Sequence, residues 1–395
     1  MIRFAQRLAP LERNVFADMD RAKAAAIAAG RDLIDLSLGS SDLPTPQRVL
    51  DVIARSLEDQ ETHQYLLFNN TRTFRQAAAQ WYTDRYGVAI NPETEVLPLI
   101  GSQEGTAHIP LALLEPGDYA LLQDPGYPSH AGGVHLAGGQ IHAMPLEAKN
   151  HFLPDFRQIP KAVLDRAKLM VLSYPHNPTS AIASLDFFRD AVAFCERHDL
   201  VLVHDFPYGD LVFSGDRPPS ILQADTTKQR SIEFFTMSKS YNMGGFRVGY
   251  AIGNAELILA LRRIKAAVDF NQYRGILNGA IEALTGDQTV VTQTVETFRA
   301  RRDRLVASLA AIGWVVPTPE ATMYLWAKLP DRWAADSIDF CVQLVQATGV
   351  ALAPGAGFGA SGEGYVRFAL VQEPEVLQVA VDRLASFFKS DLTTR

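Results

Sequence analysis

The feature that most constrains this chain is a series of short apolar segments separated by helix-like stretches, between about residues 47 and 285. The segments mostly do not alternate between polar and apolar residues, and each ends in a loop of Gly, Pro or polar residues. They begin at Val96, Tyr119, Gln140, Leu169, Leu200, Ile232 and Arg247. Such strands, joined by helices, are typical of a largely parallel sheet that is buried on both faces. Ligands of these sheets bind beyond the C-terminal ends of the strands. We therefore expect an α/β fold with a mostly parallel seven-stranded sheet and a site at its strand ends.

The pattern changes after about residue 286. A long helix is predicted over residues 291–313, and a further helix and three short apolar segments follow it, which begin at Trp314, Met323 and Tyr365. This mixture predicts a second, smaller α+β domain.

The beginning of the chain is expected to pack with this second part. Residues 14–30 are rich in alanine and predict a helix that ends at Gly30, and a short strand is expected from Leu33. We expect residues 47–285 to form the large domain, and residues 1–46 with 286–395 to form the small one.

The composition of the chain argues against several classes of function and location. A formal net charge of -7 without a basic stripe argues against a nucleic-acid binder. The two cysteines, Cys195 and Cys341, are too few for a disulfide framework and fit a reducing compartment. The N-terminus has charges where a signal peptide needs an apolar run, and no uncharged apolar stretch approaches the ~18 residues of a membrane span. We expect a cytoplasmic protein that binds neither nucleic acid nor membrane.

The most informative loop follows the sixth apolar segment and contains Ser238-Lys239 and then Gly245-Phe246-Arg247-Val248-Gly249. A lysine in a Ser/Thr-rich loop just past a strand can form an imine with an aldehyde. Arg247 offers a forked donor that suits a phosphate. Taken alone, Lys239 could equally be a surface residue and Arg247 a structural one.

The spacing Ser-Lys-x5-Gly-x-Arg-x-Gly resembles the lysine signature of the class I/II aminotransferases, which are pyridoxal-phosphate (PLP) enzymes of fold type I. The resemblance covers about residues 30 to 370. It implies that Lys239 carries PLP as a Schiff base and later serves as the general base. It also places Thr236, Ser238 and Arg247 among the cofactor-binding residues.

Two further strand ends match the same family. By resemblance, Asp205 pairs with the pyridine nitrogen of PLP, and Tyr208 and Asn177 hydrogen-bond the phenolic oxygen of the cofactor. A carboxylate keeps that nitrogen protonated, so that the ring becomes an electron sink. Without the lysine motif, Asp205 would be interpreted as a helix cap and Asn177-Pro178 as an ordinary turn.

The phosphate end is expected at Gly101-Ser102-Gln103, a Gly-flanked turn that leads into a helix. Without a ligand, this turn would be a plain helix N-cap. Tyr127, in a Pro-Gly-Tyr-Pro turn, matches the aromatic residue that stacks on the cofactor ring.

Three elements concern the substrate and a partner subunit. Arg367 matches the arginine that clamps the substrate carboxylate, and Gly39, Ser40 and Asn177 are expected to line the same pocket. Tyr65 lies where the family has a tyrosine that reaches the phosphate of the neighbouring subunit, although the glycine that usually follows is replaced here by Asn69-Asn70-Thr71. We therefore expect a homodimer.

Three functions are compatible with these motifs to different degrees. The first is transamination between an L-amino acid and a 2-oxo acid, with glutamate and 2-oxoglutarate as the pair that family analogy suggests. The second is a C–S β-lyase or related lyase on the same scaffold. The third is a regulator with an aminotransferase-like domain, which the acidic charge and the few residues before the first site element disfavour.

Local sequence similarity narrows the subfamily. The segments that begin at Pro219, Ser240 and Asp269 resemble LL-diaminopimelate aminotransferase-like and alanine/aspartate-type members. Some relatives that act on acidic substrates have a lysine near position 103, so Gln103 argues against a dedicated aspartate enzyme.

Other motifs predict no function. Residues 355–360 fit Gly-x-Gly-x-x-Ala, but no helix is expected after them, which argues against dinucleotide binding. The segment Cys195-Glu-Arg-His198 lies on a predicted helix, and no zinc spacing occurs elsewhere, so no metal site is expected. Four histidines are expected to be loop or strand residues with structural roles: His130, His135, His176 and His204.

Overall fold

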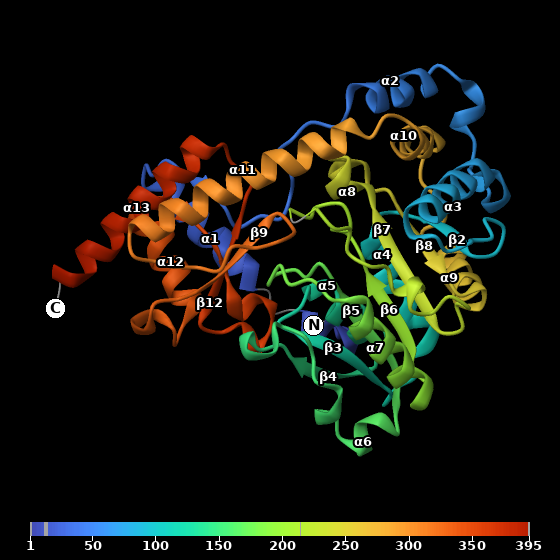
Figure 1. Cartoon of the computed structure of the whole chain (residues 1–395), viewed down its shortest axis with the longest axis horizontal. Helices are drawn as coiled ribbons and strands as arrows, with labels where there is room; N and C mark the ends of the chain where they lie inside the picture. Colours follow the sequence, from blue (N-terminus) through green and yellow to red (C-terminus); the bar gives the residue numbers. More distant parts are fainter. Residues whose placement is uncertain (1, 12–14, 214, 394–395) are drawn as a thin grey trace.

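The computed structural model describes residues 2–11, 15–213 and 215–393. Figure 1 shows a sheet covered by helices on one side of the molecule and a smaller group of helices and strands on the other. The long helix α11 (Thr289–Ala311) runs between these two parts.

The larger part is built on a seven-stranded sheet of order β2-β8-β7-β6-β5-β3-β4. Its strands are β2 (Val96–Leu99), β3 (Tyr119–Asp124), β4 (Gln140–Pro145), β5 (Ala167–Ser173), β6 (Val201–Asp205), β7 (Ser231–Thr236) and β8 (Gly249–Gly253). Only β8 runs against its neighbours, because it pairs in antiparallel fashion with both β2 and β7. The seven predicted strands and the mostly parallel sheet are confirmed. The C-terminal ends of β5, β6 and β7 meet at one edge.

Both faces of the sheet are covered by helices, as unalternated apolar strands require. Neighbouring residues such as Leu121 and Leu122 belong to different hydrophobic clusters, one on each face. The helices over one face are α3 (Arg72–Tyr86), α7 (Leu185–Arg197) and α10 (Arg274–Thr285); those over the other are α4 (Ser102–Leu113), α5 (Pro128–Ala137) and α9 (Ala255–Val268). The shorter helices are α2 (Gln47–Ser56), α6 (Lys161–Leu164) and α8 (Met237–Ser240).

The smaller part combines both ends of the chain around a third cluster, which includes Met19, Leu36, Phe298 and Phe368. Its elements are α1 (Val15–Ala28), β1 (Ile34–Asp35), α11, β9 (Tyr324–Lys328), α12 (Ser337–Thr348), β10 (Val350–Ala351), β11 (Ala353–Pro354), β12 (Tyr365–Ala369) and α13 (Pro374–Thr393). Strand β1 pairs with β10, and β12 lies between β11 and β9. The segment at Trp314 forms no strand; the indole instead donates a hydrogen bond to the Lys328 carbonyl at 2.8 Å. This packing supports the division at residues 46/47 and 285/286, which remains our proposal.

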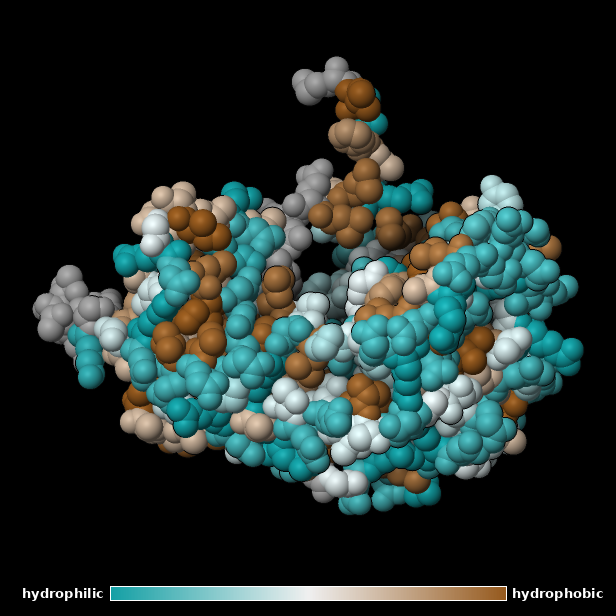
Figure 2. Space-filling view, turned by 90° about the horizontal axis from the view of Figure 1, so that it is seen from above, coloured by the Kyte–Doolittle hydropathy of each residue, from teal (hydrophilic) through white to brown (hydrophobic). Residues whose placement is uncertain are grey.

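A cavity of about 1000 Å3 opens where the strand ends of the sheet face the smaller part. Figure 2 shows the surface hollowed between two lobes. Residues from both parts line this cavity, among them Asp205 from β6 and Arg367 from β12.

Candidate functional site

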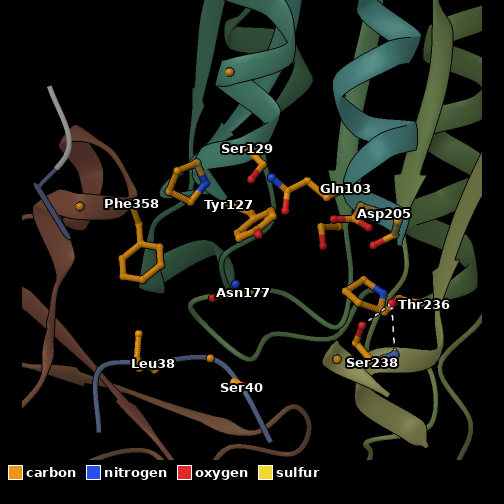
Figure 3. A pocket seen from close by; sticks show the side chains of 18 of the residues that line it. Leu38, Ser40, Gln103, Tyr127, Ser129, Asn177, Asp205, Thr236, Ser238 and Phe358 are labelled. Carbon is orange, nitrogen blue, oxygen red and sulfur yellow. Dashed lines mark hydrogen bonds between the residues drawn. The ribbon is translucent and has the colours of Figure 1, made fainter. Parts of the chain in front are cut away.

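The cavity collects nearly all the residues that the sequence predicted to act together. Every predicted site residue except Tyr65 lines it: Gly39, Ser40, Ser102, Gln103, Tyr127, Asn177, Asp205, Tyr208, Thr236, Ser238, Lys239, Arg247 and Arg367. Figure 3 shows Tyr127, Gln103 and Ser129 on one wall, with Leu38 and Phe358 facing them from the smaller part.

Lys239 lies on the short helix α8, which begins directly after β7. Thr236 caps this helix, since its hydroxyl oxygen accepts a hydrogen bond from the Ser238 N–H at 3.2 Å (Figure 3). The partly buried Lys239 Nζ donates a hydrogen bond to the Gly39 carbonyl and lies 5.9 Å from the centre of the Tyr208 ring. The nucleophilic amine therefore lies inside the cavity, between the two parts of the molecule.

Asp205 ends strand β6 and is 3% exposed. Its Oδ2 is 3.0 Å from His130 Nε2, whereas its buried Oδ1 has no hydrogen-bond partner among the described residues. A buried carboxylate oxygen without a donor is costly, so a ligand that supplies an N–H there would be stabilised. The protonated pyridine nitrogen of PLP is such a donor, and Asp205 therefore fits the expected cofactor.

The opposite end of the cavity fits a phosphate. Gly101 has the left-handed φ of +72° just before α4, so the backbone turns there where a side chain would be strained. A Cβ atom at Gly101 would lie 2.6 Å from a terminal nitrogen of Arg247, so this glycine makes room for the guanidinium. The N-terminus of α4, with Ser102 and Gln103, and the cationic Arg247 together form an anion-binding region.

Arg367 forms the substrate end of the cavity. Its NH1 donates to Asn177 Oδ1 and its NH2 to the Ser37 carbonyl, both at 2.8 Å. The buried Nε has no partner among the described residues. The guanidinium carbon lies 4.1 Å from the Tyr324 ring and 4.7 Å from the Phe358 ring. The group is thus held in one orientation, with a donor left for a carboxylate.

The contact with Arg367 also orients Asn177. Because Asn177 Oδ1 accepts from the arginine, the amide NH2 of the same side chain remains to donate elsewhere in the cavity. This agrees with the predicted hydrogen bond from Asn177 to the phenolic oxygen of the cofactor, which remains a proposal.

Two residues of the site were missed by the sequence reasoning. His130, expected as a loop or strand histidine, lies in the first turn of α5 and contacts Asp205. Its position three residues after Tyr127, which was itself predicted to lie at the site, is a signal that the sequence offered. Tyr324 was part of a predicted strand, and nothing in its local sequence distinguishes it from a core residue.

Tyr324 is almost fully buried, and its hydroxyl accepts a hydrogen bond from the Tyr208 hydroxyl at 2.9 Å. Burial tends to raise the pKa of Tyr324, but the positive charges of Lys239 and Arg367 and the bond from Tyr208 together lower it below its usual value. Burial, together with Tyr324, raises the pKa of Tyr208 well above the ordinary range. Of the two hydroxyls, Tyr324 is therefore the better acceptor.

Tyr65 lies outside the cavity and is 87% exposed. The neighbouring Leu66 is buried, and its carbonyl accepts a hydrogen bond from Asn271 Nδ2 at 2.8 Å, which fixes the backbone beside Tyr65. Tyr65 therefore does not contribute to the cavity of the chain to which it belongs. The predicted role of Tyr65 in the site of a neighbouring subunit remains a proposal.

The other histidines have separate environments. His135 lies on α5 and lines the cavity, which corrects its interpretation as a loop or strand residue. Burial and the nearby His130 lower the pKa of His176 to about 3, and its Nδ1 is 2.8 Å from the Thr179 hydroxyl. His204 Nδ1 is 2.7 Å from a carboxylate oxygen of Glu233, and both side chains are fully buried.

The remaining motifs have structural surroundings. The glycine-rich segment 355–360 is followed by short 3-10 helices and β12 instead of an α-helix, as expected. Carboxylate and imidazole groups of Glu104, His108 and Asp269 lie within 4.8 Å of one another. The Lys265 ammonium is already 2.8 Å from Glu104 and 3.5 Å from Asp269, so a cation is present in this cluster.

Comparisons with known proteins agree with the geometry. The family model "Aminotransferase class I and II" matches residues 31–384. The LL-diaminopimelate aminotransferase of Dehalococcoides mccartyi is 43% identical over 386 residues, which cover 98% of this chain and 99% of the relative. The corresponding protein of Moorella thermoacetica is 42% identical over 380 residues, 96% of this chain and 97% of the relative.

A solved structure gives the same result. The probable N-succinyldiaminopimelate aminotransferase from Thermus thermophilus is 43% identical, with a TM-score of 0.89 over 94% of this chain and 99% of that one. In the part of the chain that the structure describes, we find no helix long and apolar enough to cross a membrane. The chain belongs to the class I and II aminotransferases of fold type I, and is a PLP-dependent aminotransferase.

Proposed function

We propose that the enzyme moves an amino group between an L-amino acid and a 2-oxo acid, with Lys239 as the residue that binds PLP covalently and as the general base. The observation that carries the proposal is the arrangement of Arg367, which lines the same cavity as Lys239 and whose buried Nε has no hydrogen-bond partner among the described residues. Both substrates of a transamination have a carboxylate next to the reacting carbon, so one arginine serves both half-reactions.

When bound, PLP supplies an electron sink that stabilises negative charge at the substrate Cα. Arg367 holds the substrate carboxylate and so fixes the position of Cα. Lys239 Nζ removes the proton from Cα and returns it on the other side of the C–N bond. Its contact with the Gly39 carbonyl keeps the amine at the boundary between the two parts of the molecule.

The same proposal assigns the other residues. Asp205 Oδ1 accepts from the pyridine nitrogen, and Tyr127 stacks on the ring. Tyr208 and Asn177 bind the phenolic oxygen. The phosphate is held by Ser102, Gln103, Thr236, Ser238 and Arg247, and Gly39 and Ser40 line the carboxylate pocket.

LL-diaminopimelate is the first amino donor to test, with 2-oxoglutarate as acceptor and glutamate as product. The names of the relatives support this choice. The rim of the cavity adds a second reason. Asp20 and Lys23 lie there as an ion pair with a distance of 2.8 Å, and Lys23 also contacts Asp35 at 3.1 Å, so the exposed Asp20 carboxylate offers an acidic group to the second ammonium of a diamino acid.

The test adds single amino acids, including LL-diaminopimelate, alanine, aspartate and glutamate, to the PLP-loaded enzyme. The absorption spectrum of the bound cofactor is followed while the released products are assayed. A transaminase converts one of these amino acids into its 2-oxo acid in a single turnover. Release of ammonia and pyruvate with recovery of the starting spectrum would instead show the C–S β-lyase or a related lyase.

We also propose a homodimer in which Tyr65 reaches the phosphate of the neighbouring site. Its exposure and the fixed backbone beside it support this arrangement. A monomeric mass in solution together with full activity would contradict it.

A further inference from the structure

Tyr324 contacts three residues of the site, Arg367, Tyr208 and Gly39, which come from separate segments of the chain. Its ring lies 4.1 Å from the Arg367 guanidinium carbon, and its hydroxyl accepts from Tyr208 at 2.9 Å. The same hydroxyl occupies the space that a Cβ atom at Gly39 would need, and the Gly39 carbonyl in turn accepts from Lys239.

The backbone of Tyr324 is fixed independently of these contacts. The residue begins β9 and pairs with Ala369 at the end of β12. Its carbonyl accepts from the Ser180 hydroxyl at 2.9 Å, and its N–H donates to the Thr322 hydroxyl at 3.1 Å. The residue is also 1% exposed, so its side chain has little freedom to move away from the groups it contacts.

The Tyr208 hydroxyl carries one proton, and under the proposed function two acceptors compete for it. One is the Tyr324 oxygen, to which Tyr208 donates in this structure. The other is the phenolic oxygen of the cofactor. A hydroxyl can donate fully to only one of them, so the presence of Tyr324 weakens what Tyr208 gives to the cofactor.

We propose that Tyr324 is a positioning residue that links the two ends of the site: its ring holds Arg367, and its hydroxyl shares the proton of Tyr208 with the cofactor. This inference rests on the proposed role of Tyr208. The charged and titratable groups that face Tyr324 are Lys239 from α8, Arg367 from β12, Tyr208 from the loop after β6 and Tyr127 from the loop after β3.

Tyr324→Phe tests the hydroxyl, because it keeps the ring over Arg367. The measurement is the pH midpoint of the absorption change of the bound cofactor in the holoenzyme, without any amino acid. A stronger bond from Tyr208 stabilises negative charge on the phenolic oxygen and so favours the deprotonated chromophore. The midpoint should fall by about half a unit to one unit, the amount that one net hydrogen bond supplies.

Tyr82→Phe is the matched control. Tyr82 is also buried and also shares a hydrogen bond with another hydroxyl, that of Ser220, but it lies outside the cavity. The Tyr82→Phe variant should leave the pH midpoint of the bound cofactor unchanged. An unchanged or raised midpoint in Tyr324→Phe would overturn the proposal, as would an equal fall in both variants.

A double-mutant cycle with Tyr208→Phe shows whether Tyr324 acts through Tyr208. In that background, Tyr324→Phe should have no further effect on the midpoint, and a second full shift would exclude the coupling.

The ring is tested by Tyr324→Leu, which should raise the KM for the amino donor about tenfold more than Tyr324→Phe does. Equal KM values would overturn the part of the proposal that concerns Arg367. Because the midpoint requires no substrate, it separates this inference from the choice between transaminase and lyase.

Discussion

Replacing Arg367 with lysine tests the central assumption of the proposed function. The substitution retains a positive charge in the cavity but removes the planar fork of donors. The arginine uses NH1 for Asn177 and NH2 for the Ser37 carbonyl, and its buried Nε has no hydrogen-bond partner among the described residues. A lysine has one nitrogen and cannot keep both internal bonds while it also holds a carboxylate.

The expected loss of kcat/KM can be worked out from the hydrogen bond that the substitution removes. If the substitution costs one charge-assisted hydrogen bond to the substrate carboxylate, transition-state binding weakens by about 1.5–3 kcal/mol. At 1.36 kcal/mol for each tenfold change, kcat/KM should fall by about 10- to 150-fold. PLP should stay bound, because the phosphate end of the cavity has its own donors on α4 and at Arg247.

The assay is steady-state formation of 2-oxo acid with the amino donor that the spectral test identifies, combined with the PLP content of the purified variant. Arg75→Lys provides a control, because Arg75 is a buried arginine of α3 outside the cavity. Its kcat/KM should equal that of the wild type. A kcat/KM for Arg367→Lys within threefold of the wild type, or loss of PLP from that variant, would refute the role given to Arg367.

Asp205→Asn should lower kcat by about a hundredfold or more while circular dichroism shows a folded chain, because the amide cannot keep the pyridine nitrogen protonated; near-normal turnover would contradict this. Glu104→Gln should lower the free energy of unfolding by about 1–3 kcal/mol, since it removes the nearer carboxylate partner of the buried Lys265 ammonium and leaves Asp269 at 3.5 Å. Adding Lys265→Met to that variant should restore much of the loss in urea denaturation. Burial raises the pKa of Asp124, so its ionised form costs stability at neutral pH and the folded state gains stability as the pH falls through this raised pKa. Asp124→Asn should therefore change the Tm more favourably at pH 8 than at about pH 4, near the ordinary pKa of an aspartate, and a change that becomes more favourable toward acid pH would show the reverse sign. Lys239→Ala should abolish the absorption band of covalently bound PLP, and a retained band would refute the assignment.

Much of the site could be predicted because parallel strands present their C-terminal ends at one edge. Asp205 and Asn177 follow consecutive predicted strands, so the apolar runs directed attention to these strand ends, and the resemblance to the family then brought the two residues into one site. Family resemblance supplied the roles of Lys239 and Arg367. The glycine at position 39 was also expected from resemblance, and the structure adds the physical reason, which is the Tyr324 hydroxyl in the place of a side chain.

What could not be predicted depends on how elements that are distant in the sequence pack against one another within each part of the molecule. Tyr324 lies in an apolar run on β9, and only the pairing of β9 with β12 brings it beside Arg367. His130 becomes a partner of Asp205 because the first turn of α5 begins at the edge of the sheet where β6 also ends, which brings together residues 75 positions apart. Single-sequence periodicity predicts which residues are buried but not which buried polar groups meet.

Arg367 has two separate connections to the cofactor end of the cavity, and together they explain how substrate binding can affect the chemistry. One passes through Asn177, whose oxygen accepts from Arg367 and whose NH2 remains free to donate. The other passes through Tyr324, which contacts the guanidinium and accepts from Tyr208. In the proposed arrangement both connections end at the phenolic oxygen of PLP. A carboxylate that binds Arg367 draws on its donors and neutralises its charge, which changes the bond to Asn177 and the charge near Tyr324 at the same time. In this arrangement, substrate binding changes the hydrogen bonds and the charge at the phenolic oxygen through Asn177 and Tyr324.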